Sequence, residues 1–229
     1  MDRRTFLTAG GALALAACAA PPRGAIDSTQ VSAPQWRAGD SWTHRRSDGY
    51  NGLPRGVLTR TVEAVDARSM RFVTRDEHGR LLGDALFESP GVQVSGTLSE
   101  NGPVVGTFTP RLLQYAFPLA SGKQWRQEFI RTDANGFRTY ASASTRIEGW
   151  EDVGAKGKAY RALLIHRTYM LGKKDAFTDP LNREEIEWYA PELRGPARLR
   201  VYEWYTTTPG HFTHRGDYFL YALESFRVA

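Results

Sequence analysis

The chain has 229 residues, of which 41% are hydrophobic and 24% are charged, and it contains a single Cys. These values exclude a disordered chain and a collagen-like chain, and the lone Cys excludes an internal disulfide. The 30 Lys and Arg exceed the 25 Asp and Glu, which gives a formal charge of +5. This mild excess contains no dense basic run and by itself predicts no anionic partner.

The first residues carry the strongest signal in the sequence. Arg3 and Arg4 form a charged start, and a stretch of small and apolar residues follows over 8–17. Ten residues in a helix span ~15 Å, about half the hydrocarbon thickness of a bilayer. The pattern therefore predicts a signal peptide over residues 1–17 and not a membrane-spanning helix.

A processing site follows this apolar stretch. Leu15-Ala16-Ala17-Cys18 resembles the lipobox of bacterial lipoproteins. The resemblance implies that the Cys18 thiol receives diacylglycerol, that the signal is cut before it, and that the new N-terminus is acylated. The alternative is a free Cys within an ordinary signal peptide. We expect a lipid-anchored protein whose membrane contact is made through Cys18.

The export route and the final membrane are less strongly specified. Arg3-Arg4-Thr5-Phe6-Leu7 resembles the twin-arginine export motif, although Asp2 and Thr8 depart from its usual flanks. A general secretory signal that holds two arginines stays open. In lipoproteins of diderm bacteria, Asp after the lipidated Cys commonly signals retention in the inner membrane. Ala19 therefore predicts the periplasmic face of the outer membrane.

Residues 18–34 comprise the Cys and a small, polar, Pro-containing segment without helical or strand periodicity. We interpret it as a flexible tether that spans roughly 22 Å. Beyond it, turn signals separate short β-type segments, from a strand at 41–45 through hairpins at 57–75 and 124–149 to a last strand at 218–228. A helical turn is expected only at 111–115.

This pattern predicts one mainly β domain over residues 35–229. Its architecture is expected to be a curved antiparallel sheet of about eleven strands, either a half-open barrel or a sandwich. No alternation of strands and helices indicates a parallel sheet.

Three short motifs add a resemblance to this fold prediction. They are Gly39-Asp40-Ser41-Trp42, then Phe117-Pro118-Leu119 with Gly122-Lys123-Gln124-Trp125, then Trp188-Tyr189-Ala190-Pro191-Glu192. In this order they resemble a group of uncharacterised bacterial periplasmic and lipoprotein domains built as half-open β-barrels. That fold is distantly similar to the lipoprotein localisation factors, which hold acyl chains in their concavity, although this chain lacks their helical lid. The resemblance carries no catalytic or ligand-binding residue.

One strand face mixes cations with aromatic rings. Arg198, Arg200, Tyr202 and Trp204 alternate along one segment, while Leu199 and Val201 take the opposite, buried face. We expect the four residues to contact an acyl chain and its anionic headgroup, or a sugar, at the rim of the concave sheet. The alternative is an ordinary outer sheet face with cation–π pairs.

Other candidate chemistry is thin. Glu185 and Glu187 share a strand face, as the paired carboxylates of a hydrolase require, but their pattern favours a half-solvated edge. His211 and His214 are interpreted as part of a solvated loop rather than a metal site. The sequence thus predicts no catalytic residue, metal or cofactor, and an exported lipoprotein is not expected to bind nucleic acid.

Together these features predict an envelope-anchored lipoprotein that binds an apolar or amphiphilic ligand, with an envelope lipid or a glycan as candidates. The alternative is a scaffold or assembly partner in a cell-envelope protein complex. An envelope anchor concentrates a domain among amphiphiles, and this chain has 11 Phe, 10 Tyr and 6 Trp with which to contact them.

Substitution of the anchor tests the first expectation. Cys18→Ala should leave an unprocessed precursor that incorporates no labelled palmitate, because the thiol that accepts the lipid is gone. The measurement is the radiolabel in the immunoprecipitated protein. Equal label in the variant and the wild type would contradict the assignment of the lipobox.

Overall fold

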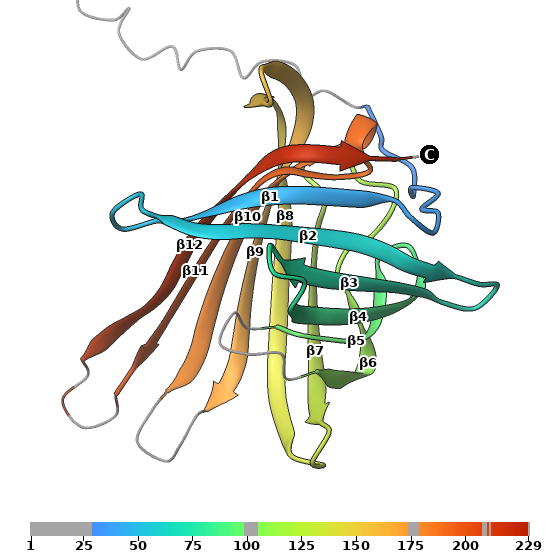
Figure 1. Ribbon diagram of the computed structural model, residues 1–229. Coiled ribbons are helices and arrows are strands. Elements are labelled where there is room, and N and C mark those ends of the chain that lie inside the picture. Colours follow the sequence, from blue (N-terminus) through green and yellow to red (C-terminus); the bar gives the residue numbers. More distant parts are fainter. Residues whose placement is uncertain (1–28, 99–104, 174–178, 208–209, 211, 229) are drawn as a thin grey trace, which may run out of the picture.

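The computed structural model describes residues 29–98, 105–173, 179–207, 210 and 212–228. Within these residues the chain forms twelve antiparallel strands in one closed barrel (Figure 1). Each strand pairs with the strand before it in the sequence, and β1 also pairs with β12, which closes the ring. The strands are β1 (Ser41–Asp48), β2 (Pro54–Val65), β3 (Met70–Asp76), β4 (Leu81–Ser89), β5 (Val92–Gly96), β6 (Gly106–Leu113), β7 (Gln124–Asp133), β8 (Arg138–Ala155), β9 (Lys158–Lys173), β10 (Pro180–Ala190), β11 (Gly195–Thr206) and β12 (Thr213–Arg227).

The predicted fold class is confirmed, with two differences in detail. The barrel is closed rather than half-open, because β1 has a hydrogen-bonded partner on both sides. The helical turn expected at 111–115 is wrong, since β6 continues to Leu113 and pairs there with Val92 of β5. Pairing with β5 supplies backbone hydrogen bonds that an isolated turn between two prolines would lack.

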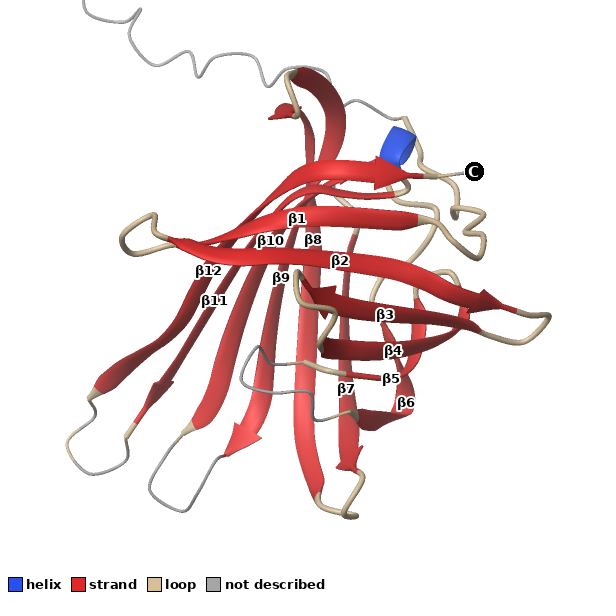
Figure 2. Cartoon of the chain, in the orientation of Figure 1, coloured by secondary structure: helices blue, strands red, loops and turns tan. Residues whose placement is uncertain are grey.

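Helical structure among the described residues is confined to one 3₁₀ turn, η1 (Pro191–Leu193), between β10 and β11 (Figure 2). In the described part of the chain, no helix is long and apolar enough to cross a membrane. The side chain of Trp42 in β1 fastens this turn, because its indole N–H donates to the carbonyl of Leu193 at 2.7 Å. Gly195 permits this approach, since a Cβ there would lie 3.2 Å from the Trp42 Nε1.

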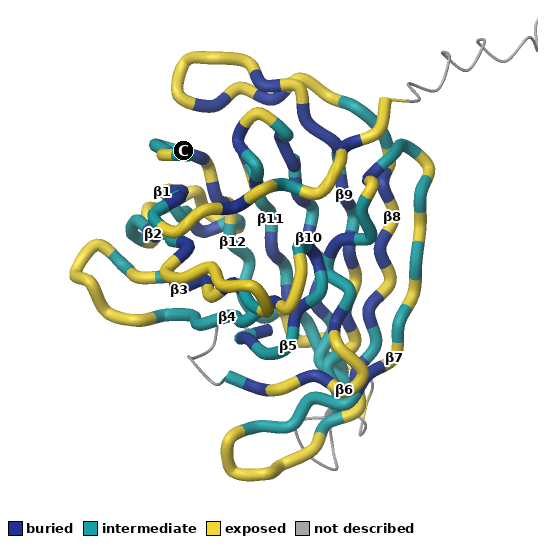
Figure 3. The backbone as a smooth tube through the Cα atoms, turned by 90° about the vertical axis from the view of Figure 1, so that its right-hand side faces the viewer, coloured by how far each residue is buried: buried dark blue, intermediate teal, exposed yellow. Residues whose placement is uncertain are grey.

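Side chains alternate between the inside and the outside of the barrel along each strand. In β8 the inner positions include Ala141, Ala143 and Ile147, which are buried, whereas Ser144 and Arg146 between them are exposed. Figure 3 shows the same alternation of buried and exposed positions along the tube.

Aromatic side chains fill one part of the interior. Trp36, Trp42, Phe72 and Phe87 belong to one buried cluster. The rings of Trp36 and Phe72 meet edge to face, with centroids 4.9 Å apart and an interplanar angle of 83°. Such pairs contribute roughly 0.5–1.5 kcal/mol beyond the burial of their area. This cluster places large flat surfaces around the space that the next section describes.

The in-and-out register can be checked with two matched substitutions. Ile147 in β8 is fully buried inside the barrel, whereas Ile186 in β10 lies on the outer face and is partly exposed. Ile147→Ala should lower the free energy of unfolding by about 2–5 kcal/mol, because it leaves a cavity. Ile186→Ala should cost clearly less in urea unfolding. Equal costs, or a larger cost at Ile186, would contradict the register.

Candidate functional site

A cavity of about 300 Å³ lies inside the barrel. The side chains around it come from the loop before β1, from strands on both sides of the ring, and from the segment after β6. Aromatic side chains form a large part of its wall, beside leucine, arginine and glutamate side chains. The aromatic ones include Trp36, Trp42, Phe72, Tyr115, Tyr169 and Tyr189. The cavity is therefore an interior space with broad apolar walls, and it is the principal candidate for a binding site.

Charged side chains form a compact network on the β9–β11 side of this interior. Arg167 in β9 lies opposite Glu185 in β10 and donates to it at 2.8 Å. Arg183 in β10 donates to Glu185 and to Glu203 of β11, both at 2.8 Å. We call these four residues the interior charge network. All four are buried, so each charge depends on its partner because little water reaches it.

Two neighbouring carboxyl groups differ in their protonation behaviour. Burial opposes ionisation of Glu185, but the attraction of Arg183 and Arg167 exceeds it and lowers the pKa of Glu185 below its ordinary value. For Glu187, burial is the stronger influence and raises the pKa above its ordinary value. The Tyr115 hydroxyl donates to Glu187 at 2.8 Å, while the Arg167 nitrogen stands 3.6 Å away.

Arg60 stands apart from this network. It extends from the inner face of β2, between Leu58 and Val62, and lines the cavity. Its guanidinium lies over the ring of Phe72, 4.6 Å from the centroid, and 6.0 Å from that of Phe87. Among the described residues it has no hydrogen bond and no ion pair.

His44 also lines the cavity. Its Nε2 is 2.9 Å from the carbonyl oxygen of Pro196, so the neutral ring carries its proton on that nitrogen. Burial is the main cause that lowers the pKa of His44, and the nearby charge of Arg60 acts in the same direction. The imidazole therefore adds no cation to the cavity at neutral pH.

The expectation for Glu185 and Glu187 needs correction. The two carboxylates do share a face, but that face is the closed interior and not a half-solvated edge. The outer positions of this strand hold Ile186 and Trp188 instead. Burial of this polar face is compensated by Arg167 of the neighbouring strand β9 and by Arg183 of β10 itself, which both pair with Glu185.

Sequence reasoning also missed Arg60, Arg167 and Arg183 as interior residues. A signal for the first two exists, since each occupies a strand position two residues from apolar or aromatic side chains that face inward. Arg60 lies between Leu58 and Val62, and Arg167 between Ile165 and Tyr169. A cationic side chain that shares a strand face with buried apolar residues indicates either an interior ion pair or a ligand contact.

The four predicted ligand-binding residues, Arg198, Arg200, Tyr202 and Trp204, lie together on the outer face of β11. Their opposite face points inward, where Leu199 lines the cavity and Val201 is buried, as expected. Arg198 stacks over Trp188 at 5.7 Å, and Arg200 approaches Glu184 at 3.4 Å. The strand therefore separates these four side chains from the interior cavity, and their role in ligand binding stays a prediction.

Two of them belong to an outer aromatic cluster of Tyr50, Tyr202, Trp204 and Tyr218. Tyr202 and Trp204 are stacked, with centroids 5.1 Å apart and an angle of 21°. Tyr218 meets Tyr202 edge to face at 5.5 Å, and Tyr50 meets Tyr218 in the same way at 5.3 Å. Strands β11 and β12 and the β1–β2 turn thus build one aromatic surface outside the barrel.

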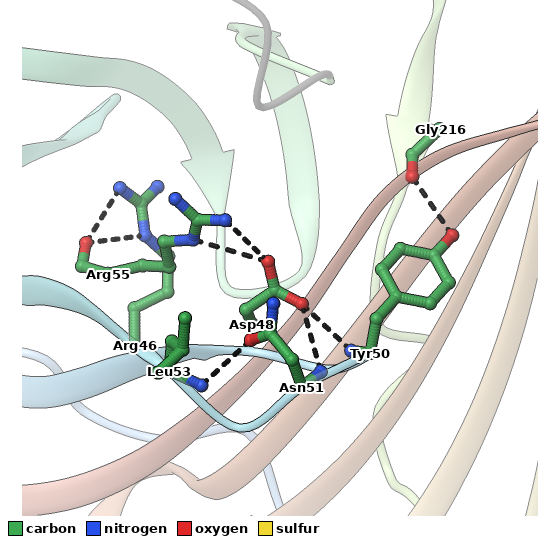
Figure 4. A network of polar contacts seen from close by, with 7 residues as sticks. All are labelled: Arg46, Asp48, Tyr50, Asn51, Leu53, Arg55 and Gly216. Carbon is green, nitrogen blue, oxygen red and sulfur yellow. Dashed lines mark hydrogen bonds and ion pairs between the residues drawn. The ribbon is translucent and has the colours of Figure 1, made fainter.

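Polar contacts hold the turn that carries Tyr50. Asp48 accepts hydrogen bonds from the Arg55 side chain at 2.6 Å and from the backbone N–H of Tyr50 at 2.9 Å (Figure 4). The Tyr50 hydroxyl donates to the carbonyl of Gly216 in β12 at 3.0 Å. The side-chain bond from Arg55 is the main cause that lowers the pKa of Asp48. These contacts fix the orientation of the Tyr50 ring.

The remaining candidates lie outside the described residues or at the surface. Arg3, Arg4, Cys18 and His211 lie outside them, and the two proposed segments 1–17 and 18–34 do so in large part. His214 stacks on Tyr205 with centroids 5.0 Å apart. The described residues contain no group of three or more His, Cys, Asp or Glu side chains arranged to hold a metal ion.

The chain aligns with solved bacterial proteins, of which the first named here shares its fold. A candidate lipoprotein from Parabacteroides distasonis aligns with a TM-score of 0.52 and 12% identity, over 87% of this chain and 100% of that one. A candidate exported protein with a YmcC-like fold from Bacteroides fragilis aligns at 0.49 and 16%, over 87% and 99%. The hypothetical lipoprotein YmcC from Escherichia coli aligns at 0.44 and 9%, over 85% and 90%. No family model and no curated protein matches the sequence.

The interior charge network predicts different costs at two adjacent carboxylates. Glu185→Gln should lower the free energy of unfolding by about 3–5 kcal/mol at pH 7, because it leaves Arg167 and Arg183 buried without their shared anion. Glu187→Gln should cost clearly less, since an amide oxygen can still accept the Tyr115 hydroxyl. Urea unfolding of both variants measures the difference.

The pH dependence provides a second check on the same pair. The lowered pKa of Glu185 contributes stability above the ordinary carboxyl pKa, and this contribution is lost as the pH falls through the lowered value. The raised pKa of Glu187 contributes stability at low pH, which is lost as the pH rises through the raised value. Glu187→Gln should abolish the loss of stability at rising pH and leave the loss at falling pH unchanged. A larger cost for Glu187→Gln than for Glu185→Gln would contradict these roles.

Proposed function

We propose that this protein is an exported, lipid-anchored protein of the bacterial envelope whose barrel interior binds an apolar or amphiphilic ligand. The role is binding rather than catalysis. The observation that carries the proposal is the interior cavity of about 300 Å³. Ligand sites are typically concavities of about 300–1,000 Å³ with mainly apolar walls and a few placed polar groups.

The walls of the cavity match that description. Trp36, Trp42 and Phe72 supply flat apolar surface, while Arg60 and Gln93 supply polar groups. A well-packed interior rarely leaves such a space, because each unfilled methyl-sized void costs stability. The retained space therefore favours an occupant over a purely structural core.

The N-terminal signals support the location. A lipobox at Cys18 places the domain at a membrane, where amphiphiles are abundant, and several acyl chains give a stable anchor because each buried CH₂ contributes ~0.8 kcal/mol. The similarity to a candidate lipoprotein concerns the fold alone. With Ala19 after the Cys, we propose the periplasmic face of the outer membrane.

The outer aromatic cluster favours a second candidate, an assembly role in a cell-envelope protein complex. Tyr50 is 48% exposed, and Leu53 in the same turn is 57% exposed. Tyr and Trp are enriched at the centres of protein interfaces, and exposed apolar patches mark docking sites. This surface and the interior cavity are separated by the strand wall, so one protein can carry both.

A pair of variants decides where an apolar ligand binds. Ala85 in β4 lines the cavity, so Ala85→Phe should fill it and reduce the affinity for a fluorescent fatty acid at least tenfold. Tyr202→Ala with Trp204→Ala changes only the outer face and should leave that affinity within twofold. Fluorescence titration measures binding, and circular dichroism confirms that both variants keep their strands.

The protein from residue 19 onward suits this experiment, because it keeps every residue of the described barrel and lacks the lipid-accepting Cys18. Loss of binding in the outer-face variant alone would move the ligand to the outer aromatic cluster. No saturable binding by the unsubstituted protein would overturn the proposal and favour the assembly role.

A further inference from the structure

Arg60 is the starting point, because its environment inside the barrel is electrostatically incomplete. A guanidinium carries five N–H donors and stays charged in proteins, and removing it from water is costly unless an anion compensates it. Arg60 is partly buried, and its guanidinium lies over the ring of Phe72 and near that of Phe87, with no hydrogen bond or ion pair among the described residues. A cation–π contact returns part of the lost hydration but satisfies none of the N–H groups.

The carboxylates of the barrel interior are already engaged elsewhere. Glu185 and Glu203 accept hydrogen bonds from Arg183, and Glu185 also accepts one from Arg167. Glu187 accepts its hydrogen bond from Tyr115. These acids influence Arg60 through space without reaching it at ion-pair distance.

The other cations around the cavity have partners, which sets Arg60 apart. Arg183 belongs to the interior charge network, Arg194 lies 3.5 Å from Asp40, and Arg46 donates to the carbonyl of Arg55. Thr97 adds a second incomplete group at the cavity wall, because its buried hydroxyl has no hydrogen-bond partner among the described residues.

We infer that the ligand of the barrel is a single-chain anionic amphiphile whose carboxylate or phosphate head pairs with Arg60 while its chain lies against the aromatic walls. This inference rests on the proposed function and specifies its ligand. The planar fork of an Arg matches both kinds of anion in a two-pronged hydrogen bond. A volume of about 300 Å³, at the lower end of the usual range, favours one chain over two.

The test compares a charged amphiphile with its neutral analogue. Dodecanoate and 1-dodecanol, below their micelle-forming concentrations, are titrated by calorimetry into the protein from residue 19 onward. The unsubstituted protein should bind dodecanoate at least tenfold more tightly than dodecanol. Arg60→Met keeps a chain of similar shape on Phe72 without the charge, so the two affinities should become equal within about twofold.

Two further variants separate charge from fold. Arg60→Lys should keep part of the preference, since it retains a cation without the planar fork. Arg126→Met, at an exposed position of β7, should leave the preference unchanged. Thermal unfolding without ligand should show Arg60→Met at or above the stability of the unsubstituted protein, because a partly buried charge without an ion-pair partner among the described residues is removed. Dodecanoate should then raise the melting temperature of the unsubstituted protein more than that of Arg60→Met.

Each other outcome is informative. An unchanged preference in Arg60→Met, or tighter binding of dodecanol by the unsubstituted protein, would overturn the role of Arg60 and leave the proposed function intact. Absence of binding by either compound would overturn both. Dodecyl phosphate and inorganic phosphate distinguish the source of the anion, and equal Arg60-dependent binding of the two would replace the amphiphile with a free anion.

Discussion

The pairing of β1 with both β2 and β12 is the constraint on which the rest of the structure depends. It closes the ring, and a closed ring turns the two faces of every strand into an inside and an outside. Once that division exists, each residue that alternates along a strand is either enclosed or exposed. The cavity, the interior charge network and the outer aromatic cluster all follow from this assignment of faces.

Closure also explains why ionic groups can be held inside. Arg167 and Glu185 occupy directly opposite positions of β9 and β10, and Arg183 and Glu203 do so on β10 and β11. Opposed charges at such positions attract across the strands, and burial makes the attraction stronger and the loss of either partner more costly. On the β2 side, Arg60 forms no ion pair with a carboxylate among the residues that the structure describes. The interior charges on the β9–β11 side are therefore paired with one another, whereas Arg60 on the β2 side can accept an anion as its partner.

Much of the architecture could be predicted from the sequence, because turn residues and strand periodicity are local signals. Asn135-Gly136 marks the hairpin between β7 and β8. The faces of β11 were also assigned correctly, with Leu199 and Val201 inward. The stretch at 111–115 failed because its bracketing prolines suggested a short turn, whereas the preceding strand, β5, pairs with Leu112 and Leu113.

The candidate site was harder to predict, for a physical reason. A period of two divides a strand into two faces but does not say which one is enclosed when both contain polar residues. On β10 the face of Glu185 and Glu187 resembles a solvent-exposed edge until the arginine on the next strand is placed opposite. The environment of Arg60 likewise could not be predicted, because it depends on where β10 lies relative to β2 in the closed barrel. Such contacts depend on strand register over long separations, which composition and spacing do not encode.

The central claim is that the ligand lies inside the barrel, and photo-crosslinking tests it most directly. A fatty acid with a diazirine in its chain is irradiated with the protein, and the labelled residues are identified by peptide mass spectrometry. The account predicts label on interior residues such as Phe72 and Tyr189, suppressed by an excess of unlabelled fatty acid. Saturable label on Tyr202 and Trp204, with none on the interior residues, would contradict it.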